Sequence, residues 1–132
     1  MRSGTLIDAA DQRLLADPAW YATGLWEPAR GLLFRPPLRP GSALIIPTRG
    51  VHTVGMAYSL DLIALDRHWN VLAVWENCAP WRLGPQHRRA RYFVEMRAGS
   101  LAERPVQPGM RLKWREEPDL NPAWVLPESA KG

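Results

Sequence analysis

A histidine and an aspartate stand out in the stretch GVHTVGMAYSLDLIALD, residues 50–66, because the rest of it has the apolar pattern of β-strands. His52 and Asp61 are both ionisable, and burying an ionisable group without a partner costs free energy. The two residues therefore have either a structural role, as partners of buried backbone groups, or a chemical one. In the chemical role His52 is a general acid or base near neutral pH, and Asp61 orients it or holds a substrate.

The residues around this pair favour binding over catalysis. Ser59 and Thr53 are not set in a nucleophile elbow, and Cys78 lacks the context of a catalytic cysteine. The favoured hypothesis is a non-enzymatic accessory module with a concave face for a peptide, a small polar ligand or a partner protein, lined by His52, Thr53, Met56 and Asp61. The alternative is an uncharacterised hydrolase or lyase that uses His52 and Asp61.

The expected register keeps the two ionisable residues apart. If residues 57–60 form the turn of a hairpin, Met56 pairs with Asp61 and His52 pairs with Leu65, so all of them face one side. His52 then lies about 13 Å from the level of Asp61, at about 3.3 Å per residue, which is too far for a hydrogen bond. Asp61 is expected to be buried and paired with an arginine, preferably Arg30, or with backbone amides.

Arginine dominates the basic residues of this chain, which has a formal net charge of +4. The densest cluster lies in WRLGPQHRRARY, residues 81–92, and holds Arg82, Arg88, Arg89 and Arg91. Guanidinium groups bind phosphates and carboxylates, so these four arginines are candidates for weak, non-specific binding of a polyanion. Nucleic acid is the less favoured partner, because the segment lacks the signature of a single-strand binding strand.

Composition limits the remaining possibilities. A chain of 132 residues that is 46% hydrophobic is long enough for one domain, expected over residues 1–115, followed by an irregular, proline-rich tail over residues 116–132. One cysteine and three histidines make no zinc spacing, so neither a structural metal nor a cofactor is expected. No apolar run is long enough to span a bilayer and no signal peptide is recognisable, which predicts a cytoplasmic protein.

The turn and strand signals predict a mainly β fold. Residues 5–8 and 13–16 are expected to form a short hairpin or a strand with a bend, and Asp17 before Pro18 is typical of the start of a helix. From residue 43 onward six short apolar runs bounded by turn residues predict a small, barrel-like, mostly antiparallel sheet with one or two short helices. A single helical turn is expected at residues 98–104.

The apolar pattern also predicts which strands are central. Residues 60–66 and 71–77 are apolar on both faces and are expected in the middle of the sheet. Residues 91–97 alternate, which predicts a half-exposed strand with Glu95 on its solvent side. Asn70 is expected to take the left-handed conformation in the hairpin between the two central strands.

The order of short motifs along the chain resembles the prokaryotic family called domain of unknown function 192, over roughly Thr5 to Trp114. The matching positions are Arg30, Gly31 and Leu32; His52, Thr53 and Met56; Asp61; Asp66; Glu76 and Asn77; Ala98 and Gly99; and Pro108 and Gly109. The resemblance implies a compact β-rich barrel with short helices and carries no known reaction, substrate or cofactor. It also implies a bacterial or archaeal setting, and for short members a link to pilus assembly or secretion.

The chain departs from the family pattern at two positions. Trp69 stands where the hairpin usually has glycine, and Pro105 stands where a glycine usually precedes the Pro-Gly pair. The second change predicts an early end to the helical turn after Ala98.

Overall fold

The computed structural model describes residues 1–23, 38–53 and 56–117, which form nine strands and one short helix. The strands are β1 (Arg2–Asp8), β2 (Leu14–Tyr21), β3 (Ala43–Ile46), β4 (Gly50–His52), β5 (Leu60–Leu65), β6 (Val71–Cys78), β7 (Leu83–Gln86), β8 (Tyr92–Arg97) and β9 (Leu112–Glu116), and the helix is α2 (Ser100–Glu103). The mainly β fold and the helical turn near residue 100 are confirmed.

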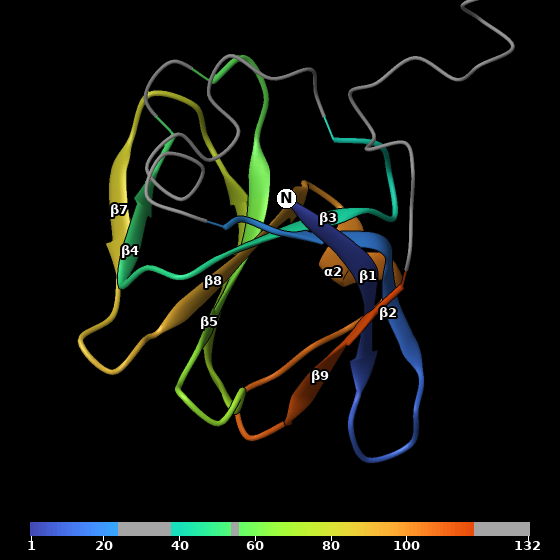
Figure 1. Ribbon diagram of the computed structural model, residues 1–132. Helices are drawn as coiled ribbons and strands as arrows, with labels where there is room; N and C mark the ends of the chain where they lie inside the picture. The colour runs from blue at the N-terminus through green and yellow to red at the C-terminus, as the bar shows by residue number, and fades with distance from the viewer. Residues whose placement is uncertain (24–37, 54–55, 118–132) are drawn as a thin grey trace, which may run out of the picture.

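Seven of the strands form one curled sheet in the order β6-β5-β8-β3-β2-β1-β9. All neighbours are antiparallel except β2 and β3, which are parallel. β4 and β7 form a separate antiparallel pair, called the β4–β7 ribbon below, which stands apart from β1, β2 and β9 (Figure 1).

The curl brings the two edges of the large sheet together at one end. Asn70, just before β6, forms an isolated bridge with Arg111, just before β9. Around it the Val71 amide donates to Met110 O at 2.8 Å and the Leu112 amide donates to Trp69 O at 2.9 Å. In the described part of the chain β6 and β9 meet only around this bridge, so the sheet is barrel-like without being a closed barrel.

Alternation along the strands gives the sheet two apolar faces, because successive side chains point to opposite sides. One face packs as a core around Leu6, Ile63 and Val94. The other packs as a second core, called the Trp20 face below, around Trp20, Leu62 and Phe93. Burial on both faces explains why β5 reads as an apolar run.

Two expectations about strand position are wrong. β6 was expected in the middle of the sheet but forms its edge, while the strand at residues 91–97, expected to be half exposed, is β8 between β5 and β3. Residues Phe93 to Met96 are all buried. The alternation in β8 separates two cores rather than a core from solvent, which the pattern of one strand cannot distinguish.

The helix expected to start at Asp17 is also absent, because these residues lie in β2. The Asp17 amide donates to Gly41 O at 2.8 Å. β2 shifts its register against β1 between Ala19 and Ala16, so Pro18 lies at an irregularity where its missing N–H breaks no regular ladder. Sheet pairing on both sides therefore overrides the local helix-start signal. The hairpin expected just before it is confirmed as β1 and β2.

The left-handed residue of the β5–β6 hairpin is Trp69, with φ 67°, and not Asn70. Asn70 instead donates its amide and its side-chain Nδ2 to the Asp66 carboxylate, at 2.9 and 3.1 Å. The Trp69 ring lies 4.8 Å from that of Tyr92. This packing offsets the strain of a left-handed tryptophan.

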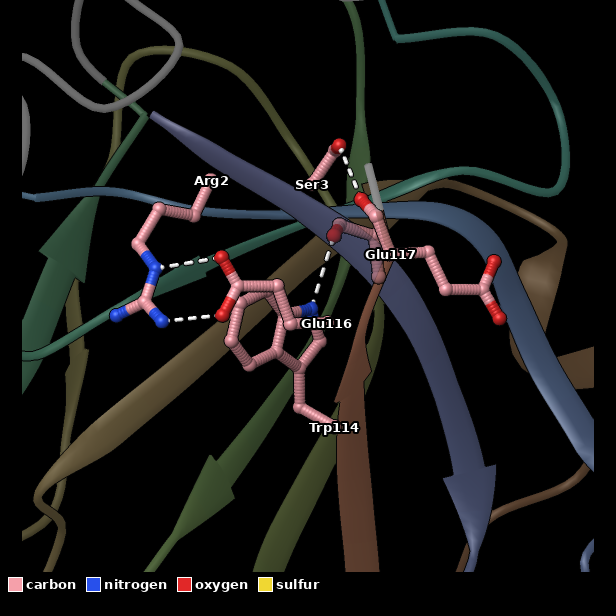
Figure 2. A network of polar contacts seen from close by, with 6 residues as sticks. Arg2, Ser3, Trp114, Glu116 and Glu117 are labelled. Atoms are coloured by element: carbon pink, nitrogen blue, oxygen red, sulfur yellow. Dashed lines mark hydrogen bonds and ion pairs between the residues drawn. The ribbon is translucent and has the colours of Figure 1, made fainter. Parts of the chain in front are cut away.

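β1 and β9 approach each other unusually closely at Gly4. A Cβ built on Gly4 would lie 2.1 Å from Arg115 O and 2.8 Å from Trp114 Nε1. The same pair of strands is joined by the Arg2–Glu116 ion pair and by a hydrogen bond from Ser3 Oγ to Glu117 O at 3.0 Å (Figure 2). Trp114 Nε1 donates to Ala19 O at 3.0 Å and so reaches across to β2.

Gly4→Ala is expected to lower the free energy of unfolding by about 1 to 3 kcal/mol, because backbone atoms of β9 occupy the space of the new methyl group. Urea unfolding measures the change. Ser3→Ala, which removes one exposed hydrogen bond next door, is the control and is expected to cost under about 1 kcal/mol. Equal stability of Gly4→Ala and the parent protein would contradict the close approach of the two strands.

Candidate functional site

His52 lies on the exposed side of the β4–β7 ribbon. It pairs with Leu83, and its side chain is exposed, whereas the preceding Val51 packs against the Trp20 face. The histidine is therefore open to solvent, in a separate sheet from Asp61.

Asp61 is fully buried in β5, and its carboxylate is saturated by backbone amides. Oδ1 accepts from the Asn77 amide at 2.8 Å, and Oδ2 accepts from the amides of Gly99 at 3.1 Å and Leu101 at 2.9 Å. The expectation of a buried aspartate paired with backbone amides is confirmed. The carboxylate thereby fixes the left-handed Asn77, with φ 56°, and caps the N-terminus of α2.

The hairpin expected between His52 and Asp61 is wrong. β5 pairs with β6 and β8, and Asp61 faces Met96 rather than Met56. β4 pairs with β7 instead. That His52 and Asp61 do not form a hydrogen-bonded pair was nonetheless expected. The hydrogen bonds that the Asp61 carboxylate accepts in the described chain all come from backbone amides.

Thr53 is buried and joins the end of β4 to the loop before β7. Its hydroxyl donates to Ala79 O at 2.7 Å and accepts from the Arg82 amide at 2.8 Å. Met56 is buried in the Trp20 face. Arg30, the preferred partner of Asp61, lies outside the described residues, as do residues 118–132 of the expected tail. A binding role for these positions stays a prediction.

Glu95 is an ionisable residue whose position was predicted wrongly from the sequence. It was expected on the solvent side of its strand, but it is 4% exposed. Its neighbours across the strands are Leu44 of β3 and Leu62 of β5. Within the described chain no group donates to its Oε2. Burial raises the pKa of Glu95 from 4.5 to about 8, so the group is largely neutral at pH 7.

Two polar residues adjoin this face near Glu95. Tyr58 Oη accepts a long hydrogen bond from the Leu38 amide at 3.4 Å, and the Arg97 guanidinium lies 5.6 Å from the Tyr58 ring centre. Burial raises the pKa of Tyr58, and the charge of Glu95 adds to the rise. The sequence shows why the burial of Glu95 was missed, because its side of the strand carries Arg91 and Arg97 and only Phe93 as an apolar residue.

The predicted basic cluster is spread along and beyond the ribbon. Arg82 lies just before β7, whereas Arg88, Arg89 and Arg91 follow it, and all four are exposed. Arg49 adds a further exposed guanidinium just before β4. The cluster is therefore a band along one ribbon, rather than a compact patch.

A groove of about 430 Å³ runs along the ribbon. It is lined by Thr48, Arg49, Gly50, Val51, Leu83, Gly84 and Gln86. Beside it Leu83 is 88% exposed and Trp81 is 69% exposed. The exposure of Leu83 was not predicted from the sequence, because an apolar residue in a strand is ordinarily buried.

Comparison with known proteins gives the family. The model of domain of unknown function 192, described as an uncharacterized ACR, matches residues 7–114. The chain belongs to this family. The UPF0127 protein PH1112 of Pyrococcus horikoshii is 34% identical over 91 residues, which cover 65% of this chain and 77% of that protein.

Two solved structures share the fold. A protein of Sinorhizobium meliloti 1021, described as a "putative transcription regulator", matches with a TM-score of 0.71 at 22% identity, over 86% of this chain and 92% of that one. A protein of unknown function from Novosphingobium aromaticivorans DSM 12444 matches with a TM-score of 0.70 at 18% identity, over 85% and 84% of the two chains. At these identities the likeness is one of fold.

Two features are absent from residues 1–23, 38–53 and 56–117, which the structure describes. Among them no helix is long and apolar enough to cross a membrane. Nor does this part of the family domain gather three or more His, Cys, Asp or Glu side chains in a group that could hold a metal ion.

Asp61→Asn in this DUF192 domain is expected to lower the free energy of unfolding by about 2 to 4 kcal/mol. The asparagine side chain accepts hydrogen bonds through one oxygen only. Its NH₂ group therefore faces the backbone amides of Gly99 and Leu101, or that of Asn77, as donor against donor. Chemical denaturation measures the loss. Asp17→Asn, at an exposed position of β2, is the matched control and should change little. An Asp61→Asn protein as stable as the control would refute the amide-anchoring role.

Stability should fall as the pH rises through the titration range of Glu95. The folded state holds this proton up to about pH 8 and the unfolded chain only to about 4.5, so the protonated group favours folding. The resulting loss of stability accumulates between these values and is on the order of 5 kcal/mol at most. Glu95→Gln, which keeps the shape without the titration, should remove it.

Thermal and urea unfolding at pH 5 and pH 8 measure this difference, with Glu103→Gln, at an exposed position of α2, as the control. Relative to Glu95→Gln, the parent protein should lose free energy of unfolding between pH 5 and pH 8. The same pH dependence in both proteins would mean that Glu95 is solvated or paired in the folded state.

Proposed function

We propose that this protein is a non-enzymatic binding module that docks an acidic, extended segment of a partner protein on the β4–β7 ribbon. The observation that carries the proposal is Leu83, an aliphatic side chain that is 88% exposed beside a groove of about 430 Å³. Single exposed apolar residues are common on protein surfaces, but here Leu83 opens β7 and the exposed Trp81 lies two residues before it in the chain.

The chemistry of the groove supports an acidic occupant. Arg49 lines it, no acidic side chain is among its lining residues, and Arg82 stands just before Leu83. Guanidinium groups bind carboxylates with two hydrogen bonds, so a partner that alternates carboxylates with apolar side chains matches both features. The arginines at 88, 89 and 91 extend the positive charge beyond the end of β7.

The geometry of the ribbon supports an extended partner. In the described chain the ribbon has only two strands, so each strand has one edge without a strand neighbour. Such edges accept extended segments through backbone hydrogen bonds, with side-chain contacts giving specificity. The partner's own β-strand would then present alternate residues to the groove and to solvent.

Catalysis is less well supported. The Asp61 oxygens already accept three amide hydrogen bonds, which leaves the carboxylate no free role beside His52. Burial raises the pKa of the Cys78 thiol and the charge of Asp61 adds to the rise, which disfavours the nucleophilic thiolate. The hydrolase or lyase alternative therefore lacks the carboxylate that was expected to orient His52, and it lacks a nucleophile among the residues considered for it.

We favour a protein partner over nucleic acid on this surface. Leu83, which is 88% exposed, offers no ring for stacking and leaves Trp81 to do so, whereas single-strand binding stacks successive bases on several aromatic side chains. We further propose a cytoplasmic location. An accessory role in pilus assembly or secretion rests on the family resemblance alone.

The test is a titration with a heptapeptide in which Glu alternates with Leu, followed by calorimetry. Leu83→Ser and Arg49→Gln are each expected to weaken binding by about fivefold or more. Leu14→Ser, at a 38% exposed leucine of β2, and Arg39→Gln, at an exposed arginine away from the ribbon, are matched controls and should leave binding unchanged.

Three results would overturn the proposal: absence of peptide binding to the folded protein, equal weakening by the controls, or displacement of the peptide by a short single-stranded oligonucleotide that binds more tightly. The last result would assign the surface to nucleic acid.

A further inference from the structure

A second groove, of about 460 Å³, lies where the two edges of the large sheet meet. Its lining residues are Ala9, His68, Trp69, Arg111, Leu112, Lys113 and Trp114. They come from the turn after β1, the β5–β6 hairpin and β9, three segments that the curl of the sheet brings together. The volume lies within the range of about 300 to 1,000 Å³ that is typical of small-molecule sites.

The groove is built on a fixed backbone. The Leu112 amide donates to Trp69 O at 2.9 Å, and the Ala9 amide donates to Arg111 O at 2.9 Å. Arg111 Nε donates to His68 O at 3.2 Å, which ties the side chain to the hairpin. These bonds link all three segments, so the groove does not depend on one loop alone.

Two aromatic side chains in the groove are held by further rings. Trp69 lies 4.8 Å from Tyr92, and Trp114 lies 5.5 Å from Tyr21, between ring centres. Tyr21 and Tyr92 are 6.2 Å apart, so the four rings form one continuous row. The hydrogen bond from Trp114 Nε1 to Ala19 O fixes the second indole. Ring positions set in advance lower the entropy cost of stacking a ligand.

The charge of the groove is positive. Arg111 and Lys113 are exposed lining residues, and no acidic side chain lines the groove. The nearby Asp66 is engaged by the His68 amide at 2.8 Å and by the amide and side chain of Asn70. Asp8 is buried and accepts from the Ala10 amide at 2.9 Å. Both carboxylates are therefore bound to their own turns.

We propose that this groove binds a small planar ring that carries a phosphate group, of the nucleoside monophosphate class. The ring packs on the indole of Trp69, and the phosphate pairs with Lys113 and the free end of the Arg111 guanidinium. This site is separate from the acidic-peptide surface on the β4–β7 ribbon, because the two grooves have no lining residue in common.

The test is calorimetric titration of the full chain with adenosine monophosphate, adenosine and inorganic phosphate. Adenosine monophosphate is expected to bind at least about tenfold more tightly than either part alone, because ring and phosphate are both recognised. A short single-stranded oligonucleotide distinguishes a free nucleotide from a strand of nucleic acid. It is expected to bind more weakly than the mononucleotide.

Three variants locate the site. Lys113→Gln should weaken adenosine monophosphate binding by about fivefold to tenfold, while Arg115→Gln removes the same charge from β9 outside the groove lining and should have no such effect. Trp69→Gly removes the indole, and glycine adopts φ 67° without strain. In this variant adenosine monophosphate should bind no better than inorganic phosphate.

The proposal is overturned if adenosine monophosphate and inorganic phosphate bind the parent protein equally, or if neither binds at millimolar concentration. It is equally overturned if Lys113→Gln and Arg115→Gln weaken binding alike, which would show a general field of positive charge. Tighter binding of the oligonucleotide would replace a small ligand by nucleic acid. Circular dichroism of each variant establishes that it is folded before it is titrated.

Discussion

The hydrogen bonds of Asp61 are the constraint on which the rest of the structure depends. One buried carboxylate accepts from the amides of Asn77, Gly99 and Leu101, and so ties β5 to the bulged end of β6 and to the start of α2. Hydrogen bonds to an ionised acceptor are the stronger kind, and breaking them here would leave three amides without this partner. An aspartate in this position stabilises the fold through its amide hydrogen bonds.

Thr53 is the corresponding buried anchor of the β4–β7 ribbon. Its amide donates to Arg82 O, its carbonyl accepts from the Trp81 amide, and its hydroxyl bonds to Ala79 and Arg82. A buried polar residue thus fixes the loop that turns Trp81 and Leu83 outward. Thr53 and Asp61 are in this way anchors, whereas His52 is exposed, and the surfaces proposed for binding are the parts that these anchors hold in place.

Much of the fold followed from local patterns. Turn residues and short apolar runs predicted the mainly β class, the first hairpin and the helical turn at Ser100–Glu103. Strand order was not predictable, because β5 and β6 have similar apolar runs, yet only β5 has a strand on both sides. Which strand is central depends on pairing between segments far apart in the sequence, and one strand's composition does not determine it.

The candidate site was predicted only in part. The burial of Asp61 followed from the cost of an unpaired charge among apolar strands, and amides were named among its partners. Its register against β4 was wrong, because a tight turn after Met56 was assumed. Glu95 was missed because a carboxylate is ordinarily exposed, and the two grooves were invisible because each joins residues from separate segments.

The central claim is that the protein works as a binding module through the β4–β7 ribbon, with Asp61 as a structural anchor. Amide chemical-shift mapping by NMR during titration with the alternating Glu-Leu heptapeptide tests it most directly. The account expects shift changes concentrated in residues 48–53 and 81–87, with the amides of Gly99 and Leu101 unmoved. Changes centred instead on Gly99, Leu101 and the strand around Asp61 would contradict it, because they would place the ligand at the residue that the account assigns to the fold.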